Sequence, residues 1–137
     1  MSHPHIHARS SVKFFGGKEE DYIAIHNWFD DSKAHLGDMR HRALKHHTAG
    51  IYEAERVFGE SFVNSDGKKV YIRYVGEQHV IEDMGFLPSL ADWLENMELQ
   101  NWMMNRDKRV KEFGRELPRT LRQKIKESEQ ENIEKGD

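Results

Sequence analysis

Apolar residues recur at helical spacing in two adjacent stretches of the chain. In residues 19–36, Tyr22, Ile25 and Phe29 fall on one stripe, and an acidic start suits the positive end of a helix dipole. In residues 39–58 the core face is formed by Met39, Ala43, Ile51, Ala54 and Phe58. Because only a short break separates these stretches, they predict a helical hairpin.

Two other stretches favour extended structure. Residues 3–15 alternate so that His3, His5 and His7 would share one side of a strand, which predicts an extended N-terminal segment ended by two glycines. Residues 62–63 and 70–75 flank an Asp-Gly dipeptide, the usual signal of a hairpin turn. The pattern therefore predicts a small antiparallel sheet.

The remainder of the chain divides at about residue 105. Residues 77–84 and 88–97 predict two short helices. Residues 105–137 contain ten Lys or Arg and eight Asp or Glu, which predicts a charged helical or loosely ordered tail. We expect an α+β fold, with the helical hairpin packed on the small antiparallel sheet in a domain spanning 1–104 and the tail spanning 105–137.

Composition narrows the classes of protein. There is no cysteine, which excludes disulfides and thiolate metal sites, and the net charge of -3 gives no general attraction to nucleic acid. No apolar run approaches the roughly 18 residues that span a bilayer, and the N-terminus has no apolar secretory core. These features predict a cytoplasmic protein without membrane partners. Nucleic acid is not excluded as a binding partner, because a local basic patch could bind it.

Histidine is the unusual feature, because eight of the nine histidines lie between His3 and His47. Neutral imidazole is a common metal ligand, and several must converge to hold an ion. We therefore predict a site for a divalent metal, namely zinc, manganese or iron. Its expected ligands are His5, His7, His35, His46 and His79.

Each of these signals also has a plainer interpretation. The first histidines are compatible with a flexible end or part of a purification tag. The pairs His26–Asp30 and Asp31–His35 are spaced i,i+4, as surface ion pairs often are. His47 falls on the apolar stripe, where hydrogen-bonded core histidines are more common than ligands, and His41 points elsewhere, toward solvent.

Neighbouring residues suggest chemistry beyond metal binding. Arg40 and Arg42 form a basic surface suited to phosphate, and Glu77 or Glu82 follows the predicted hairpin as a candidate general base. The chain lacks a Walker-type phosphate loop, a G-x-S-x-G motif, an H-E-x-x-H motif and an adjacent His-Asp pair. A phosphate ester or nucleotide is the expected small-molecule partner.

Several segments together carry a family resemblance over about residues 3–103. They are HPHIHARSS, HNWFDDSKAH, RHRALKHH, SDGKKVYIRYVGEQHV and SLADWLENM, of which RHRALKHH and GEQHV are the most specific. The chain resembles a small uncharacterised family of proteins from bacteria and their phages. The resemblance implies a bacterial or phage-infected cytoplasm and argues against a tag, but it implies no catalytic residues.

Three functions are compatible with the sequence. The first is a metal-dependent hydrolase of a phosphoester or nucleotide, in which bound metal activates water. The second is a metal-binding domain with a closed ligand set and no chemistry. The third is a non-enzymatic accessory protein that binds a host protein, nucleotide or nucleic acid, with the histidines as scaffold.

Overall fold

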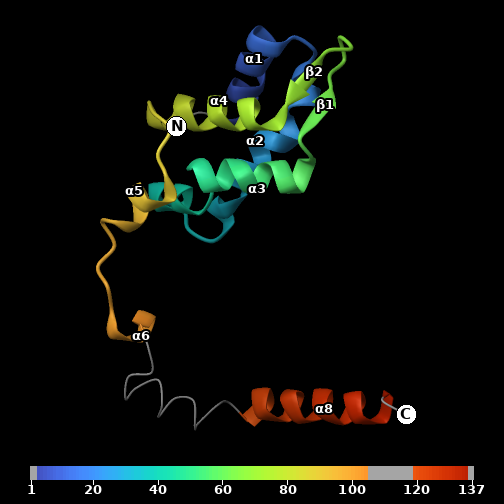
Figure 1. Ribbon diagram of the computed structural model, residues 1–137, viewed down its shortest axis with the longest axis vertical. Helices are drawn as coiled ribbons and strands as arrows, with labels where there is room; N and C mark the ends of the chain where they lie inside the picture. The colour runs from blue at the N-terminus through green and yellow to red at the C-terminus, as the bar shows by residue number, and fades with distance from the viewer. Residues whose placement is uncertain (1–2, 105–118, 136–137) are drawn as a thin grey trace. The chain divides into compact units, whose positions relative to one another are not determined.

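The computed structural model describes residues 3–104 and 119–135 (Figure 1). Contacts group the chain into two units, Met1–Met97 and Glu98–Asp137, which are described separately. The fold is α+β as predicted, mostly helical with one two-stranded antiparallel sheet. The domain boundary at residue 104 stays a prediction.

The first unit is built around helix α4. Its α-helices are α1 (Pro4–Phe15), α2 (Ile23–Asp30), α3 (Thr48–Phe58), α4 (Ile72–Met84) and α5 (Leu90–Leu94). Three 3-10 helices connect them: η1 (Glu19–Asp21), η2 (Asp31–Ala34) and η3 (Met39–Leu44). Helix α4 packs against α1, α2 and α3, so residues on α4 meet side chains from three other segments (Figure 1).

The prediction of an extended N-terminal segment was wrong, because residues Pro4–Phe15 form helix α1. Pro4 occupies the first turn, where its missing N–H costs nothing, and the side chain of His3 accepts a hydrogen bond from His5 N. The buried face carries His7, Ala8 and Ser11 at helical spacing. The three histidines therefore do not share one side of a strand.

The predicted helical hairpin is more broken than its apolar stripes indicate. The first stretch is divided into η1, α2 and η2, and the second into η3 and α3. His47 lies at the break between η3 and α3. Its backbone is extended, and its side chain accepts a hydrogen bond from Gly50 N. A Cβ at Gly50 would meet the Lys45 carbonyl oxygen at 1.8 Å, so glycine lets the chain turn tightly before α3.

The hairpin is shorter than predicted. Strands β1 (Ser61–Val63) and β2 (Lys69–Tyr71) pair in the register Ser61↔Tyr71, Phe62↔Val70 and Val63↔Lys69. Helix α4 starts at Ile72, so residues 72–75 are helical rather than extended. Gly76 lies within α4, where a Cβ would approach Phe29 Cζ to 3.0 Å and Ile51 Cγ1 to 3.2 Å.

The core of the first unit lies between α4 and its neighbours. It includes Phe29 on α2, Ile51 on α3 and Val75 on α4, all buried. Partly buried aromatic side chains such as Trp28 and Phe58 close its edge. This apolar packing surrounds the polar cluster described below and holds its members in place.

The second unit contains α6 (Asn101–Met104) and α8 (Arg119–Lys135). The predicted charged tail is helical over 119–135, and the Ile125 side chain is exposed. Residues 105–118, where the predicted tail begins, lie outside what the structure describes. Within the described residues, no helix has the length and apolar character that crossing a lipid bilayer requires.

Candidate metal centre

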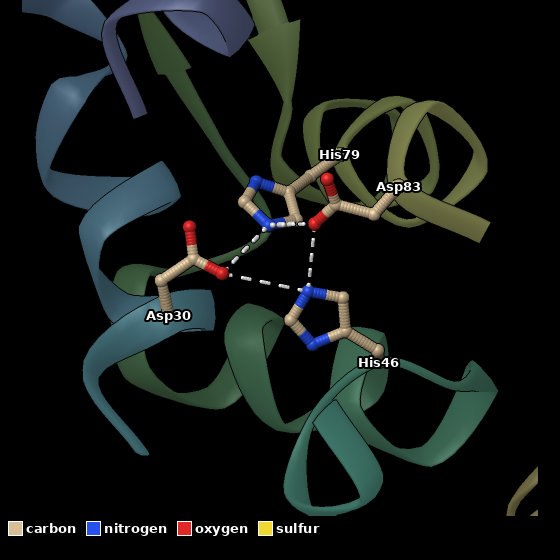
Figure 2. Close-up of side chains that lie close together, drawn as sticks. All are labelled: Asp30, His46, His79 and Asp83. Atoms are coloured by element: carbon tan, nitrogen blue, oxygen red, sulfur yellow. Dashed lines mark hydrogen bonds and ion pairs between the residues drawn. The ribbon is translucent and has the colours of Figure 1, made fainter. Parts of the chain in front are cut away.

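Four metal-ligating side chains from three segments converge beside α4 (Figure 2). Asp30 is the last residue of α2, and His46 immediately precedes the capping residue of α3. His79 and Asp83 lie one turn apart on α4, which places both on the same helix face. Two imidazole rings and two carboxylates therefore point toward one another (Figure 2).

The distances within this group match those of a coordination shell. His46 Nε2 lies 3.0 Å from Asp83 Oδ2 and 3.6 Å from Asp30 Oδ1. His79 Nε2 lies 3.2 Å from Asp83 Oδ2 and 3.4 Å from Asp30 Oδ1. Ligands about 2.1 Å from a tetrahedral zinc ion are about 3.4 Å from one another. The four nitrogen–oxygen separations bracket that value.

The group is shielded from solvent. The side chains of His46 and His79 are fully buried, and those of Asp30 and Asp83 are 7% and 2% exposed. Two ligand-side atoms, His79 Nε2 and Asp30 Oδ2, are buried without a hydrogen-bond partner. Buried polar atoms normally have partners, so an unsatisfied imidazole nitrogen facing two carboxylates fits a cation-binding role.

Both carboxylates are held in the ionised form that a metal requires. Burial alone would raise the pKa of Asp83, but hydrogen bonds with His46 and His7, together with the proximity of His79, keep it well below its usual range. Burial would also raise the pKa of Asp30. The contact with His79 outweighs this effect, so the pKa of Asp30 is lowered as well. Two adjacent negative charges in a buried site favour a divalent cation between them.

The histidines are held differently. Burial lowers the pKa of His46, opposed by its hydrogen bond with Asp83, and this favours the neutral imidazole that can bind metal. His26 is not in the four-residue group, but its Nδ1 lies 2.9 Å from His79 Nδ1. Burial, reinforced by the neighbouring His79, lowers the pKa of His26 to about 2, so His26 is neutral.

His7 supports the group from behind Asp83. Its Nε2 lies 3.1 Å from Asp83 Oδ1, the carboxylate oxygen that faces away from His46, and its Nδ1 lies 2.9 Å from Glu82 Oε1. Burial opposes protonation of His7, but these hydrogen bonds outweigh it and raise its pKa. His7 thus acts as a hydrogen-bond donor that orients Asp83, a common role beside metal ligands.

Apolar and main-chain contacts fix the remaining positions. The ring of Phe29 stacks on His79 with centroids 5.0 Å apart and an interplanar angle of 22°. This stacking depends on the close approach that Gly76 permits. Trp93 Nε1 donates to the carbonyl oxygen of His46 at 3.0 Å, so α5 braces the segment that carries this imidazole.

The structure brings together only part of the predicted ligand set. His46 and His79 belong to the four-residue group, and the ring of His7 lies 4.1 Å from that of His79. His5 is exposed and stacks on His3, while His35 is exposed after η2, so neither contributes to this group. The helical form of the N-terminus explains the difference between His5 and His7, because only His7 lies on the buried face.

The two predicted phosphate-binding arginines have different surroundings, and neither predicted general base belongs to the four-residue group. Arg40 is exposed and paired with Asp38, whereas Arg42 is largely buried with Nη2 3.7 Å from Asp83 Oδ1. Glu82 contacts His7, Gln78 and Ser10, close behind the group. Glu77 and Glu82 both line a surface hollow of about 380 Å³, together with Phe14 and Tyr74.

Sequence reasoning missed both carboxylate members of the group. Asp30 and Asp83 each follow a histidine at i,i+4, and this spacing was the available signal. The spacing pairs Asp30 with His26 alone. It gave no sign that Asp30 also faces His46 and His79. His41, expected to be solvated, is buried, with Nδ1 2.6 Å from Asp38 O. His47 is a hydrogen-bonded capping residue, in line with its plainer interpretation.

Comparison with known proteins gives a family. The model of the family described as "Domain of unknown function (DUF6915)" matches residues 2–103. The chain belongs to this family. All four members of the candidate metal centre lie within the DUF6915 match. No curated protein and no solved structure matches the chain.

Proposed function

We propose that this DUF6915 domain binds one divalent metal ion through Asp30, His46, His79 and Asp83. The observation that supports it best is the set of nitrogen–oxygen separations of 3.0–3.6 Å between two imidazoles and two ionised carboxylates. Two carboxylates and two neutral imidazoles would neutralise a divalent charge. The spacing suits zinc best, and the oxygen-rich set is also compatible with manganese or iron.

The burial of all four side chains favours a closed structural site over an open catalytic one. Structural zinc sites have four protein ligands, whereas catalytic sites keep a position for water. A metal here would tie the end of α2 and the start of α3 to α4. Because these segments are distant in sequence, such a link stabilises the folded chain much as a cross-link does.

A metal-dependent hydrolase acting on a phosphoester or nucleotide is the second candidate, supported by the position of Arg42. Its guanidinium lies beside Asp83, and its Nε is buried without a hydrogen-bond partner. Such a group suits a phosphate oxygen next to the metal. A bound metal would supply an activated water in this case.

The cytoplasmic setting in bacteria or phage-infected cells also stays a prediction.

Cobalt titration separates these possibilities. Full-length protein purified without an affinity tag and stripped by chelator is titrated with Co²⁺, and visible absorption is recorded. A closed four-ligand site gives one equivalent with the strong absorption of tetrahedral cobalt. Weak absorption with one equivalent bound indicates added water ligands and favours the hydrolase.

The neighbouring carboxylates Asp30 and Asp31 provide a matched pair of variants. Asp31 is exposed and pairs with Lys45, outside the ligand group. Asp31→Asn should keep the cobalt spectrum, whereas Asp30→Asn should lower the affinity by more than about 100-fold, beyond the usual effect of changing a supporting residue. Equal spectra for both variants, or no saturable binding by the unsubstituted protein, would contradict the proposal.

A further inference from the structure

A chain of buried hydrogen bonds extends behind His79, away from the candidate ligands. It runs from Glu82 through Gln78, Ser11 and His26 to His79. Ser11, His26 and His79 are fully buried or nearly so, and Gln78 is 9% exposed. These residues come from α1, α2 and α4, so the chain of contacts is a product of the tertiary fold.

The orientation of the Gln78 amide is fixed at the outer end. Its Nε2 lies 2.7 Å from Glu82 Oε1 and 3.0 Å from the carbonyl oxygen of His7. Both are acceptors, so the NH₂ group must face them, and the reversed amide would place oxygen against oxygen. Gln78 Oε1 therefore faces Ser11 as an acceptor.

This orientation determines the direction of the next two hydrogen bonds. Ser11 Oγ lies 2.7 Å from Gln78 Oε1 and 3.0 Å from the carbonyl oxygen of His7, both of which only accept. Donation to His26 Nε2 would leave both acceptor oxygens facing lone pairs of Oγ, so the single hydroxyl proton goes to one of these oxygens. At its third contact, 2.8 Å from His26 Nε2, Ser11 therefore accepts, and the proton lies on His26 Nε2.

The final step concerns the two facing imidazoles. The His26 ring is fully buried, and its two nitrogens contact Ser11 Oγ and His79 Nδ1 rather than a carboxylate that would stabilise a charge. The ring is therefore neutral, and with its proton on Nε2 its Nδ1 carries a lone pair. His79 Nδ1, 2.9 Å away, must then donate a proton to it. The nitrogen of His79 that remains for a ligand is Nε2, which faces Asp30 Oδ1 and Asp83 Oδ2.

We infer that Gln78, Ser11 and His26 are positioning residues that hold the His79 proton on Nδ1 and present Nε2 to a divalent metal ion. The inference rests on the proposed metal site. It assigns roles to residues outside the four ligands and explains why a buried serine and glutamine accompany them. Neutral histidine in water favours the other tautomer, so the arrangement pre-organises His79 for binding.

The direct test is imidazole NMR on the full-length ¹⁵N-labelled protein, recorded at neutral pH without metal and with one equivalent of Zn²⁺. Long-range proton–nitrogen correlations show which ring nitrogen carries hydrogen. The expected metal-free result is a protonated Nε2 and an unprotonated Nδ1 in His26, with Nδ1 of His79 protonated. A His26 ring protonated on Nδ1 would overturn the inference.

Two buried serines provide a matched comparison. Ser11→Ala removes the acceptor for His26, whereas Ser32→Ala removes a buried hydroxyl that donates to the carbonyl oxygen of His41. Ser11→Ala should redistribute the His26 proton and weaken Zn²⁺ binding by about 10–100-fold, the usual effect of removing a supporting group. Ser32→Ala should leave both the tautomers and the affinity unchanged.

The outcomes separate this inference from the proposed function. If the unsubstituted protein binds no Zn²⁺ while its tautomers are as expected, the proposed metal site is contradicted. The assigned hydrogen-bond directions are then supported, but they do not serve metal binding. If Zn²⁺ binds but His26 carries its proton on Nδ1, the metal site stands and the positioning role fails. Unchanged tautomers and affinity in Ser11→Ala would also contradict the role of Ser11.

Discussion

His46 Nε2 and Asp83 Oδ2 lie 3.0 Å apart although 37 residues separate them along the chain. His46 is carried by the turn before α3 and Asp83 by the last turn of α4, and both side chains are buried. The contact thus joins two helices that also pack through their apolar faces. The proposed metal would replace this direct contact with coordination from both groups.

His7 and His5 should differ sharply in their effect on metal affinity. His7→Gln removes the donor that orients Asp83 Oδ1, so we expect Zn²⁺ affinity to fall by about 10–100-fold. His5→Gln changes an exposed ring and should leave the affinity within error. Isothermal titration of both variants checks this, and an equal loss for His5→Gln would contradict the assigned roles.

Gly76→Ala should destabilise the protein even though alanine favours helices. A mid-helix Gly→Ala change normally adds about 1 kcal/mol of stability. At Gly76 the new methyl would press on Phe29 and Ile51, and such overpacking typically costs about 1–3 kcal/mol. Equilibrium urea unfolding measures the free energy difference.

Gly37→Ala is the control for this change. No atom lies within 4 Å of a Cβ built at Gly37, so a methyl group there meets open space. Its free energy of unfolding should stay close to that of the unsubstituted protein. Gly76→Ala being as stable as Gly37→Ala would show that α4 does not need this close approach to Phe29.

Acid should remove a specific contribution from Asp21, away from the metal centre. Asp21 accepts hydrogen bonds from Lys18 N–H, then from the N–H and hydroxyl of Ser65, and these lower its pKa below 3.8. A lowered folded-state pKa gives stability that is present above the unfolded pKa and is lost as pH falls through the folded value.

Asp21→Asn should therefore melt at a lower temperature than the unsubstituted protein at neutral pH. The difference should stay constant above about pH 5 and shrink below about pH 4, where the native carboxylate also becomes protonated. A series of thermal melts in chelator-containing buffers checks this. A difference that grows with acid would contradict the assigned contacts.

A chain ending at Met104 should keep its fold and its metal affinity. The four candidate ligands and the supporting residues His7, Ser11, His26 and Gln78 all lie in the first unit. We expect the melting temperature and the Zn²⁺ affinity of this truncated chain to match the full chain. A large fall in either would show that residues after 104 support the site.

Local patterns predicted much of the fold but not its breaks. The stripe of Tyr22, Ile25 and Phe29 identified helical structure around α2, and the Asp-Gly turn identified the β1–β2 hairpin. The N-terminal segment was misjudged because HPHIHA alternates like a strand, while proline in a first turn also favours a helix. The need for glycine at position 76 could not be predicted, because it arises from a tertiary contact with Phe29.

The sequence predicted the type of the candidate site, but only some of the residues that form it. A high density of histidines indicated a metal site, and His46 and His79 are in the group. Asp30 and Asp83 could be paired with a neighbouring histidine by spacing, but their meeting depends on how α2 packs on α4. His26 and Ser11 could not be identified from local spacing, since their role arises from contacts across three helices.

Elemental analysis tests the central claim most directly. The full-length protein and the double variant Asp30→Asn with Asp83→Asn are purified without tags or added metal, and bound metals are measured against protein concentration. The metal-site account predicts about one divalent ion per chain in the unsubstituted protein, with zinc expected, and none in the variant. Trace metal in the unsubstituted protein, at the same level as in a folded double variant and not raised by dialysis against Zn²⁺, would contradict it.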